Sequence, residues 1–160
     1  MRNWFPVAFC CLLISCGTGG SPAAAPKDSA GKTPADYARA YYDATNRDDL
    51  AAIQAMYTNG YYQAIVTKRG FLQEPDESLF ARHMEQHMHK TKSVTETKSG
   101  FFTPPNADGV YSFLAKIEFT DEYKPVFKER TGIDSPHLND EVCFKLENGI
   151  WKITDKLQGY

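Results

Sequence analysis

The sequence predicts an α+β domain in which N-terminal helices pack on one face of a curved antiparallel sheet. Three observations predict it. Apolar residues recur at helical spacing between residues 34 and 88, they alternate at strand spacing between 111 and 119, and they flank an Asn-Gly turn near the C-terminus. Helices followed by a run of antiparallel strands are typical of a two-layer α+β domain.

The first predicted helix has a clear start. Thr33 can cap it, Pro34 suits the first helical position, and the Asp36 carboxylate can bond back to the cap. An apolar stripe follows that start, so we expect a helix to about residue 45.

Two more helices are expected before the strands begin. Asp48 can cap a short second helix, and Asn59-Gly60 is expected to end it. Residues 61–72 fit a strand and a loop equally well. A third helix is expected from Asp76. The buried stripe of the second helix consists of Leu50, Ile53, Met56 and Tyr57, and that of the third consists of Leu79, Phe80, His83, Met84, His87 and Met88.

Strands fill the rest of the chain. Residues 91–102 form a Thr-rich polar pattern, and 111–119 alternate with large apolar side chains on one face. Residues 121–139 contain two prolines and a glycine, and we expect a long excursion with about one helical turn.

The closing hairpin is the strongest local signal. Asn148-Gly149 is the type I′ turn dipeptide, because both turn positions need a positive φ. The turn predicts three cross-strand pairs, which are Leu146 with Trp151, Phe144 with Ile153, and Val142 with Asp155.

Residues 1–15 have the pattern of a secretory signal peptide. An apolar run from Trp4 to Ile14 is shorter than the ~20 residues that span a bilayer. It ends in Leu13-Ile14-Ser15-Cys16, the bacterial lipobox pattern, so we expect cleavage before Cys16 and acylation of its thiol. The alternative is an ordinary signal peptide with an incidental cysteine.

The segment after Cys16 suits a tether. Residues 17–32 contain no large apolar side chain, so we expect a flexible tether over 16–32 and a folded domain over 33–160. No Asp follows Cys16 to act as the inner-membrane retention signal of enteric bacteria. We therefore expect an outer-membrane anchor, with the lipid bilayer as partner and the domain facing the periplasm.

Charge and cysteine content exclude some functions. Arg2 is the one charged side chain of the signal peptide, so 17 basic and 20 acidic side chains remain, without a basic run. Nucleic-acid binding is therefore excluded. Cys143 is the one thiol left besides Cys16, and its strand context favours a structural role over a catalytic one.

Three segments resemble the nuclear transport factor 2-like (NTF2-like) superfamily. Residues 34–44 resemble its opening helix, 47–53 its second helix, and 146–153 its closing hairpin. Small bacterial lipoproteins of the DUF4878 type share this layout. The resemblance implies a cone whose sheet wraps the first helix and leaves a pocket at its open end. The superfamily contains both enzymes and binding modules, so the fold does not choose the function.

Candidate pocket residues follow from this expected cone. They are Tyr41, His83, His87, Tyr111, Phe113 and Trp151. His83 and His87 are four apart and share a helix face, as metal ligands can. Met84 stands where a zinc protease has its glutamate, however, so we expect His83 and His87 to line the pocket or the rim of the core. His89 is the third candidate histidine of this segment. We predict no metal, no cofactor and no catalytic residue.

The function expected from these features is non-catalytic binding of a small apolar ligand or an envelope protein. The apolar ligand is suggested by the aromatic content of 13%, although the same rings also fit a plain core. Two alternatives stay open. One is an envelope enzyme with His83 or His87 as general base, and the other is a structural module that forms a homodimer through its sheet.

Overall fold

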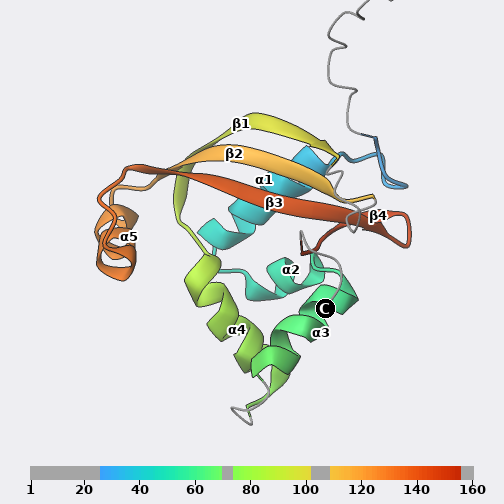
Figure 1. Ribbon diagram of the computed structural model, residues 1–160, viewed down its shortest axis with the longest axis horizontal. Coiled ribbons are helices and arrows are strands. Elements are labelled where there is room, and N and C mark those ends of the chain that lie inside the picture. The colour runs from blue at the N-terminus through green and yellow to red at the C-terminus, as the bar shows by residue number, and fades with distance from the viewer. Residues whose placement is uncertain (1–25, 70–73, 102–108, 156–160) are drawn as a thin grey trace, which may run out of the picture.

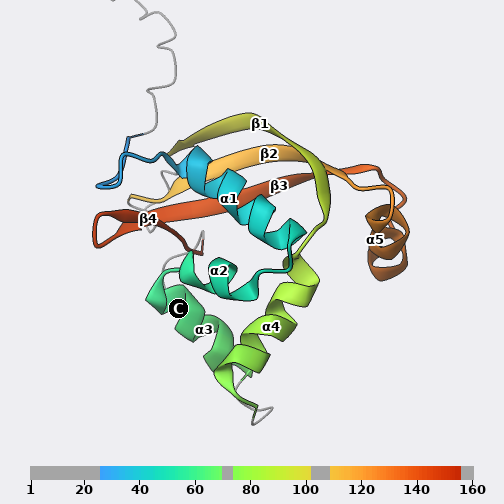
Figure 2. The same ribbon diagram turned by 180° about the vertical axis from the view of Figure 1, so that it is seen from behind.

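The computed structural model of the chain describes residues 26–69, 74–101 and 109–155 (Figure 1). Within these residues five helices and a four-stranded antiparallel sheet confirm the α+β class. The strands arc over α1, and α2, α3 and α4 lie beneath (Figure 2). In chain order the elements are α1 (Pro34–Asn46), α2 (Leu50–Ala55), α3 (Asn59–Arg69), α4 (Asp76–His87), β1 (Thr91–Phe101), β2 (Tyr111–Phe119), α5 (Tyr123–Thr131), β3 (His137–Glu147) and β4 (Ile150–Ile153).

The start of α1 confirms the predicted cap. Thr33 Oγ1 accepts a hydrogen bond from the Asp36 amide at 3.4 Å, and Asp36 Oδ2 accepts one from the Thr33 amide at 2.8 Å. The Asp36 amide also donates to the Thr33 carbonyl at 3.0 Å, and the reciprocal side-chain bonds complete the capping box. The helix buries Tyr41 and Tyr42 against the sheet side of the core.

The second helix differs from the prediction at both ends. Asp48 adopts a left-handed conformation with φ 55°, and Asp49 is the cap, accepting from the Ala52 amide at 3.0 Å. The helix ends at Ala55, and Asn59, expected to terminate it, begins α3 instead. Thr58 accepts a hydrogen bond from the Tyr61 amide at 3.2 Å. A threonine cap one residue before the Asn-Gly pair therefore starts a new helix, and residues 61–69 are neither strand nor loop.

The sheet has the order β1-β2-β3-β4, and α4 starts at Asp76 as predicted. Alternate residues of β2 are buried towards the helices, as the alternation predicts. Directly opposite residues point to the same face of a sheet. Because Asp140 pairs with Ala115 in a row that also joins Phe113 to Val142, its carboxylate lies on the helix side.

The hairpin register confirms two predicted pairs, Leu146 with Trp151 and Phe144 with Ile153. The ladder ends at Ile153, so the predicted pairing of Val142 with Asp155 is wrong. At its end β4 also bonds to the connection between α2 and α3: the Ile153 amide donates to the Met56 carbonyl at 2.6 Å. One more bond to β3 follows, from the Thr154 amide to the Cys143 carbonyl at 2.9 Å.

The segment 121–139 contains more regular secondary structure than predicted. It contains the nine-residue helix α5, and β3 already begins at His137. Tyr123 and Phe127, four residues apart, both pack on Phe119, with ring centroids 5.4 and 4.5 Å away. Gly132, at φ 74°, ends the helix. Burial of two aromatic rings explains why one turn extends into a helix.

The last residues of the expected tether belong to the folded structure. The Ser29 amide donates to the Gly149 carbonyl at 2.9 Å, and Trp151 Nε1 donates to the Pro26 carbonyl at 3.1 Å. Tyr37 Oη donates to Asp28 Oδ2 at 2.7 Å. These bonds tie residues 26–32 to the hairpin and to α1, so the folded structure already includes residues before Thr33. The signal peptide and Cys16 lie outside the described residues, and no helix within them is long and apolar enough to cross a membrane.

Candidate functional site

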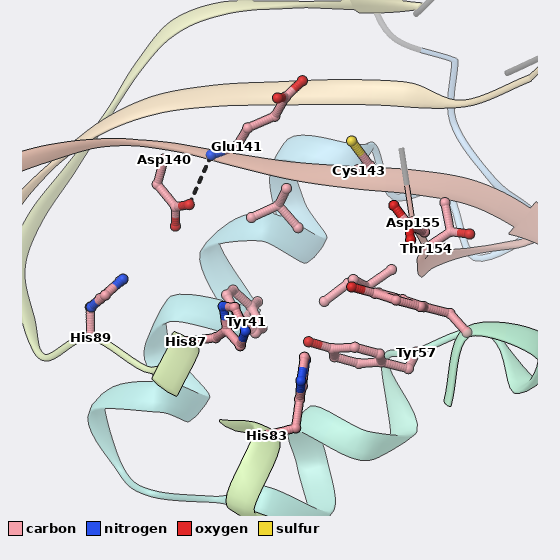
Figure 3. A pocket seen from close by; sticks show the side chains of 13 residues that line it. Tyr41, Tyr57, His83, His87, His89, Asp140, Glu141, Cys143, Thr154 and Asp155 are labelled. Atoms are coloured by element: carbon pink, nitrogen blue, oxygen red, sulfur yellow. Dashed lines mark hydrogen bonds between the residues drawn. The ribbon is translucent and has the colours of Figure 1, made fainter. Parts of the chain in front are cut away.

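A cavity of about 230 Å³ opens between α1, α4 and the helix side of β3 (Figure 3). Ligand sites for drug-sized molecules occupy ~300–1,000 Å³, so this cavity suits a small ligand. The described residues that line it are Tyr41, Tyr57, Tyr61, His83, His87, His89, Asp140, Glu141, Val142, Cys143, Ile153, Thr154 and Asp155.

The structure divides the predicted pocket residues into two groups. Tyr41, His83 and His87 line the cavity. The other three, Tyr111, Phe113 and Trp151, are not among its described lining residues and are buried in the core. Tyr111 and Trp151 lie 6.2 Å apart, centroid to centroid, near the docked segment 26–32. Their aromatic rings therefore support the hairpin rather than the cavity.

Asp140 is an acidic residue of the cavity whose carboxylate accepts two hydrogen bonds. Tyr42 Oη donates to its Oδ2 at 2.9 Å, and the Glu141 amide donates to its Oδ1 at 2.8 Å (Figure 3). Burial, and then the Asp140 charge, raise the pKa of Tyr42 well above its usual value of 10.0, so the donating hydroxyl keeps its proton. The carboxylate is thus held on the cavity wall by two donors.

Tyrosine rings form the wall opposite Asp140. Burial raises the pKa of both Tyr41 and Tyr57 well above 10.0, and the Asp140 charge adds to the effect. Both hydroxyls therefore stay neutral at any physiological pH. Tyr57 and Tyr61 stack with ring centroids 5.4 Å apart and interplanar angle 20°. The cavity thus offers hydroxyl groups and aromatic faces together.

The histidines occupy two different environments. His83 and His87 lie one turn apart on α4 with ring centroids 4.4 Å apart; His83 is half-buried, while His87 is exposed at the rim. His89 follows α4 and is half-buried against Phe119 and Phe127. Burial lowers the pKa of His89 below 6.5, opposed by Asp140, so its imidazole is neutral at pH 7.

The aspartates of the cavity lining give its described part a negative charge that no Lys or Arg balances. Two aspartates, Asp140 and Asp155, line the cavity, and none of its described lining residues is Lys or Arg. The Glu141 side chain points away from the cavity in Figure 3 and accepts a hydrogen bond from Ser112 Oγ at 2.6 Å. Low-dielectric walls with charge of one sign concentrate ligands of the opposite sign. The described residues contain no group of three His, Cys, Asp or Glu side chains placed to hold a metal ion.

Two site residues, Asp140 and Tyr57, stand out only in the structure. Asp140 lies one residue beyond the segment 121–139, which the sequence predicts as an excursion, and the alternation of Leu138, Asp140 and Val142 carries the signal of a carboxylate on an apolar face. Comparison with protein-family models, curated proteins and solved structures finds no match to this chain. The chemistry of the cavity is accordingly the basis for assigning a function.

Proposed function

We propose that this chain is a lipid-anchored cell-envelope protein whose domain binds a small protonated amine in the cavity. One observation carries the proposal: Asp140 and Asp155 lie beside tyrosine rings in a small cavity whose described lining has no Lys or Arg. Carboxylates pair with an ammonium group, and aromatic faces attract it through their quadrupoles.

The energies favour a cation over the apolar ligand suggested by aromatic content. A hydrogen bond to a charged group contributes ~1.5–3 kcal/mol, and a cation over an aromatic face contributes ~0.5–2 kcal/mol. An apolar ligand would instead strip water from Asp140 without replacing its hydrogen bonds, and that desolvation is unfavourable. The rings that suggested an apolar site, those of Tyr111, Phe113 and Trp151, lie in the core.

The experiment compares three probes that share one alkyl chain and differ in charge. Calorimetric titration of the purified chain with butylammonium, butanol and butyrate separates charge from apolar contact. We expect butylammonium to bind at least ~tenfold more tightly than butanol, which corresponds to ~1.4 kcal/mol, and butyrate to bind least. Equal or tighter binding of butanol would refute the amine proposal.

A matched pair of variants locates the binding. Asp140→Asn keeps the size of the side chain and removes its charge, so it should abolish the preference for butylammonium. Asp43→Asn makes the same change at an exposed position of α1 and should leave the preference intact. Loss of binding in both variants would point to the overall charge of the protein rather than to the cavity.

The membrane anchor is the second part of the proposal. The lipobox Leu13-Ile14-Ser15-Cys16 supports it, and residues 17–25, which contain no large apolar side chain, have the composition of a tether. A flexible tether of nine residues would span a root-mean-square distance of about 15–18 Å. The domain would thus stay close to an outer membrane, facing the periplasm.

Metabolic labelling tests the anchor. Cys16→Ser should abolish incorporation of radiolabelled palmitate and remove the protein from the membrane fraction. Cys143→Ser removes the other thiol of the mature chain and should keep the label. Labelling that survives Cys16→Ser would contradict the lipoprotein assignment.

The arrangement of helices and strands supports an NTF2-like cone. The sheet arcs over α1, and the cavity lies between the helices and the concave face (Figure 3). The outer face is polar at several positions; Ser93 Oγ, for example, donates to Glu118 at 3.0 Å. That polarity favours a binding module over a dimer formed through the sheet. An experimental structure with a flat sheet and no cavity would contradict the cone.

A further inference from the structure

The hydroxyl of Tyr123 has three hydrogen-bonding neighbours. The Met88 carbonyl oxygen lies 2.9 Å away, and His89 Nδ1 lies 3.1 Å away. The third neighbour is Arg130, whose Nη2 donates to the same oxygen. Arg130 also donates through Nη1 to the Glu85 carbonyl of α4, which ties α5 to the end of α4.

Counting protons assigns a role to each of these atoms. A guanidinium only donates and a carbonyl only accepts, whereas a tyrosine hydroxyl has one proton to give. Burial raises the pKa of Tyr123, so that proton is present at neutral pH. If the Tyr123 hydroxyl proton pointed to His89, two oxygen atoms, Tyr123 Oη and the Met88 carbonyl oxygen, would lie 2.9 Å apart without a proton between them. All four groups are satisfied only when Tyr123 donates to Met88 and His89 Nδ1–H donates to Tyr123.

We infer that Tyr123, held by Arg130, fixes His89 as its Nδ1–H tautomer, so that Nε2 faces the cavity as an acceptor and selects ammonium ligands that retain N–H bonds. This inference rests on the proposed function, because it concerns the same cavity. It makes Tyr123 a positioning residue and His89 a residue that sets specificity. A quaternary ammonium, which has no N–H, should be a poor ligand.

The surroundings of His89 support the assignment. The outer end of its ring points towards the space between Asp140 and His87 (Figure 3). No hydrogen bond to Nε2 is found within the described part of the chain. The charged or titratable groups that act on the ring are Asp140 from β3, Arg130 from α5 and His87 from α4. Burial outweighs the attraction of Asp140 and keeps the ring neutral at pH 7, so the acceptor persists.

Two fixed acceptors then face one ligand. Asp140 is oriented by Tyr42 and by its own backbone, and His89 is oriented by Tyr123. A primary ammonium has three N–H bonds and can donate to both. A trimethylated ammonium has the same charge and can donate to neither. Hydrogen bonding, and not charge alone, should therefore separate these two cations.

The tautomer can be measured without any ligand. Nitrogen-15 NMR of the histidine rings above pH 7 should show His89 with a protonated Nδ1 and an unprotonated Nε2. Tyr123→Phe should shift the ring towards the Nε2–H tautomer that neutral histidine prefers in water. Tyr62→Phe removes a hydroxyl outside the cavity lining and should change nothing. A protonated Nε2 in the unaltered protein would overturn the inference.

A second titration tests the selectivity. Butylammonium should bind at least ~tenfold more tightly than butyltrimethylammonium, the loss expected when a charge-assisted hydrogen bond is removed. Tyr123→Phe leaves the residues that line the cavity unchanged. A preference for butylammonium that arises from the larger size of the trimethylated cation should therefore persist in this variant. A preference that arises from the His89 acceptor should decrease. Equal binding of both cations would overturn the inference and leave the amine proposal standing. Binding of neither would refute the amine proposal and with it the selectivity, while the nitrogen spectrum would still decide the tautomer.

Discussion

The hydrogen bond between Tyr42 and Asp140 joins α1 to the middle of the sheet. Tyr42 is 2% exposed, and its hydroxyl lies 2.9 Å from Asp140 Oδ2. The substitution Tyr42→Phe keeps the buried ring and deletes one oxygen atom. It therefore probes this bond with little change in packing.

The loss of stability can be bounded from the surroundings of Asp140. A hydrogen bond to a charged group contributes ~1.5–3 kcal/mol to stability. Asp140 keeps the bond from the Glu141 amide, and its half-buried carboxylate lines a cavity that water can enter. Because water can partly replace the hydroxyl, we expect a loss in the lower half of that range, ~1.5–2 kcal/mol. For a domain of this size the Tm should fall by about 5–10 °C.

Urea unfolding followed by the fluorescence of buried Trp151 measures the effect. Tyr62→Phe is the matched control, since Tyr62 is half-buried and its change should stay within ~0.5 kcal/mol. A double-mutant cycle with Asp140→Asn should give a coupling energy of at least ~1 kcal/mol. A midpoint and slope for Tyr42→Phe that match those of the unaltered protein would refute the reasoning.

Three further changes test the fold. Ile117→Ala empties a fully buried position of β2 and should lower the free energy of unfolding by ~2–5 kcal/mol in urea. Gly149→Ala forces a side chain onto a residue at φ 77°, with Ser29 Oγ 3.4 Å from the new Cβ, and should lower stability by ~1–2 kcal/mol in thermal melts. Because burial lowers the pKa of His89 below 6.5, the unfolded chain binds this proton first as pH falls, and stability should drop below about pH 6.5. His89→Gln should flatten that part of the pH profile, and His137→Gln, at an exposed position, should not.

Elements with local signals could be predicted from the sequence. The Thr33–Asp36 capping box marks the start of α1 within four residues, and the Asn148-Gly149 turn sets the register of the last two strands. Both signals act between near neighbours, so they need no knowledge of the remaining chain. The sequence therefore reveals these two ends of the domain well.

The helices missed by the prediction depend on distant partners. Asn59-Gly60 has the composition of a stop signal, yet the Thr58 amide donates to the Ile153 carbonyl at 2.8 Å, which places the chain where a new helix can start. In the same way, α5 forms because Tyr123 and Phe127 find Phe119. Such contacts override weak local preferences and cannot be inferred from spacing alone.

The cavity could not be predicted from the sequence, because it depends on which residues of neighbouring strands lie opposite each other. Asp140 interrupts the apolar row of β3 opposite Ala115, the smallest side chain of that face of β2. The pairing of a small residue with a carboxylate leaves room on the helix side, and Tyr42 supplies the donor that makes the buried charge tolerable. A sequence selected only for core stability would place an apolar residue at position 140. A partly buried charge in an apolar row is therefore a conflict between local pattern and fold, of the kind that functional sites retain. His89 is a neutral polar ring packed against Phe119 and Phe127, and its orientation depends on Tyr123 and Arg130 of α5. Packing of apolar side chains alone would favour a polar group at neither His89 nor Asp140.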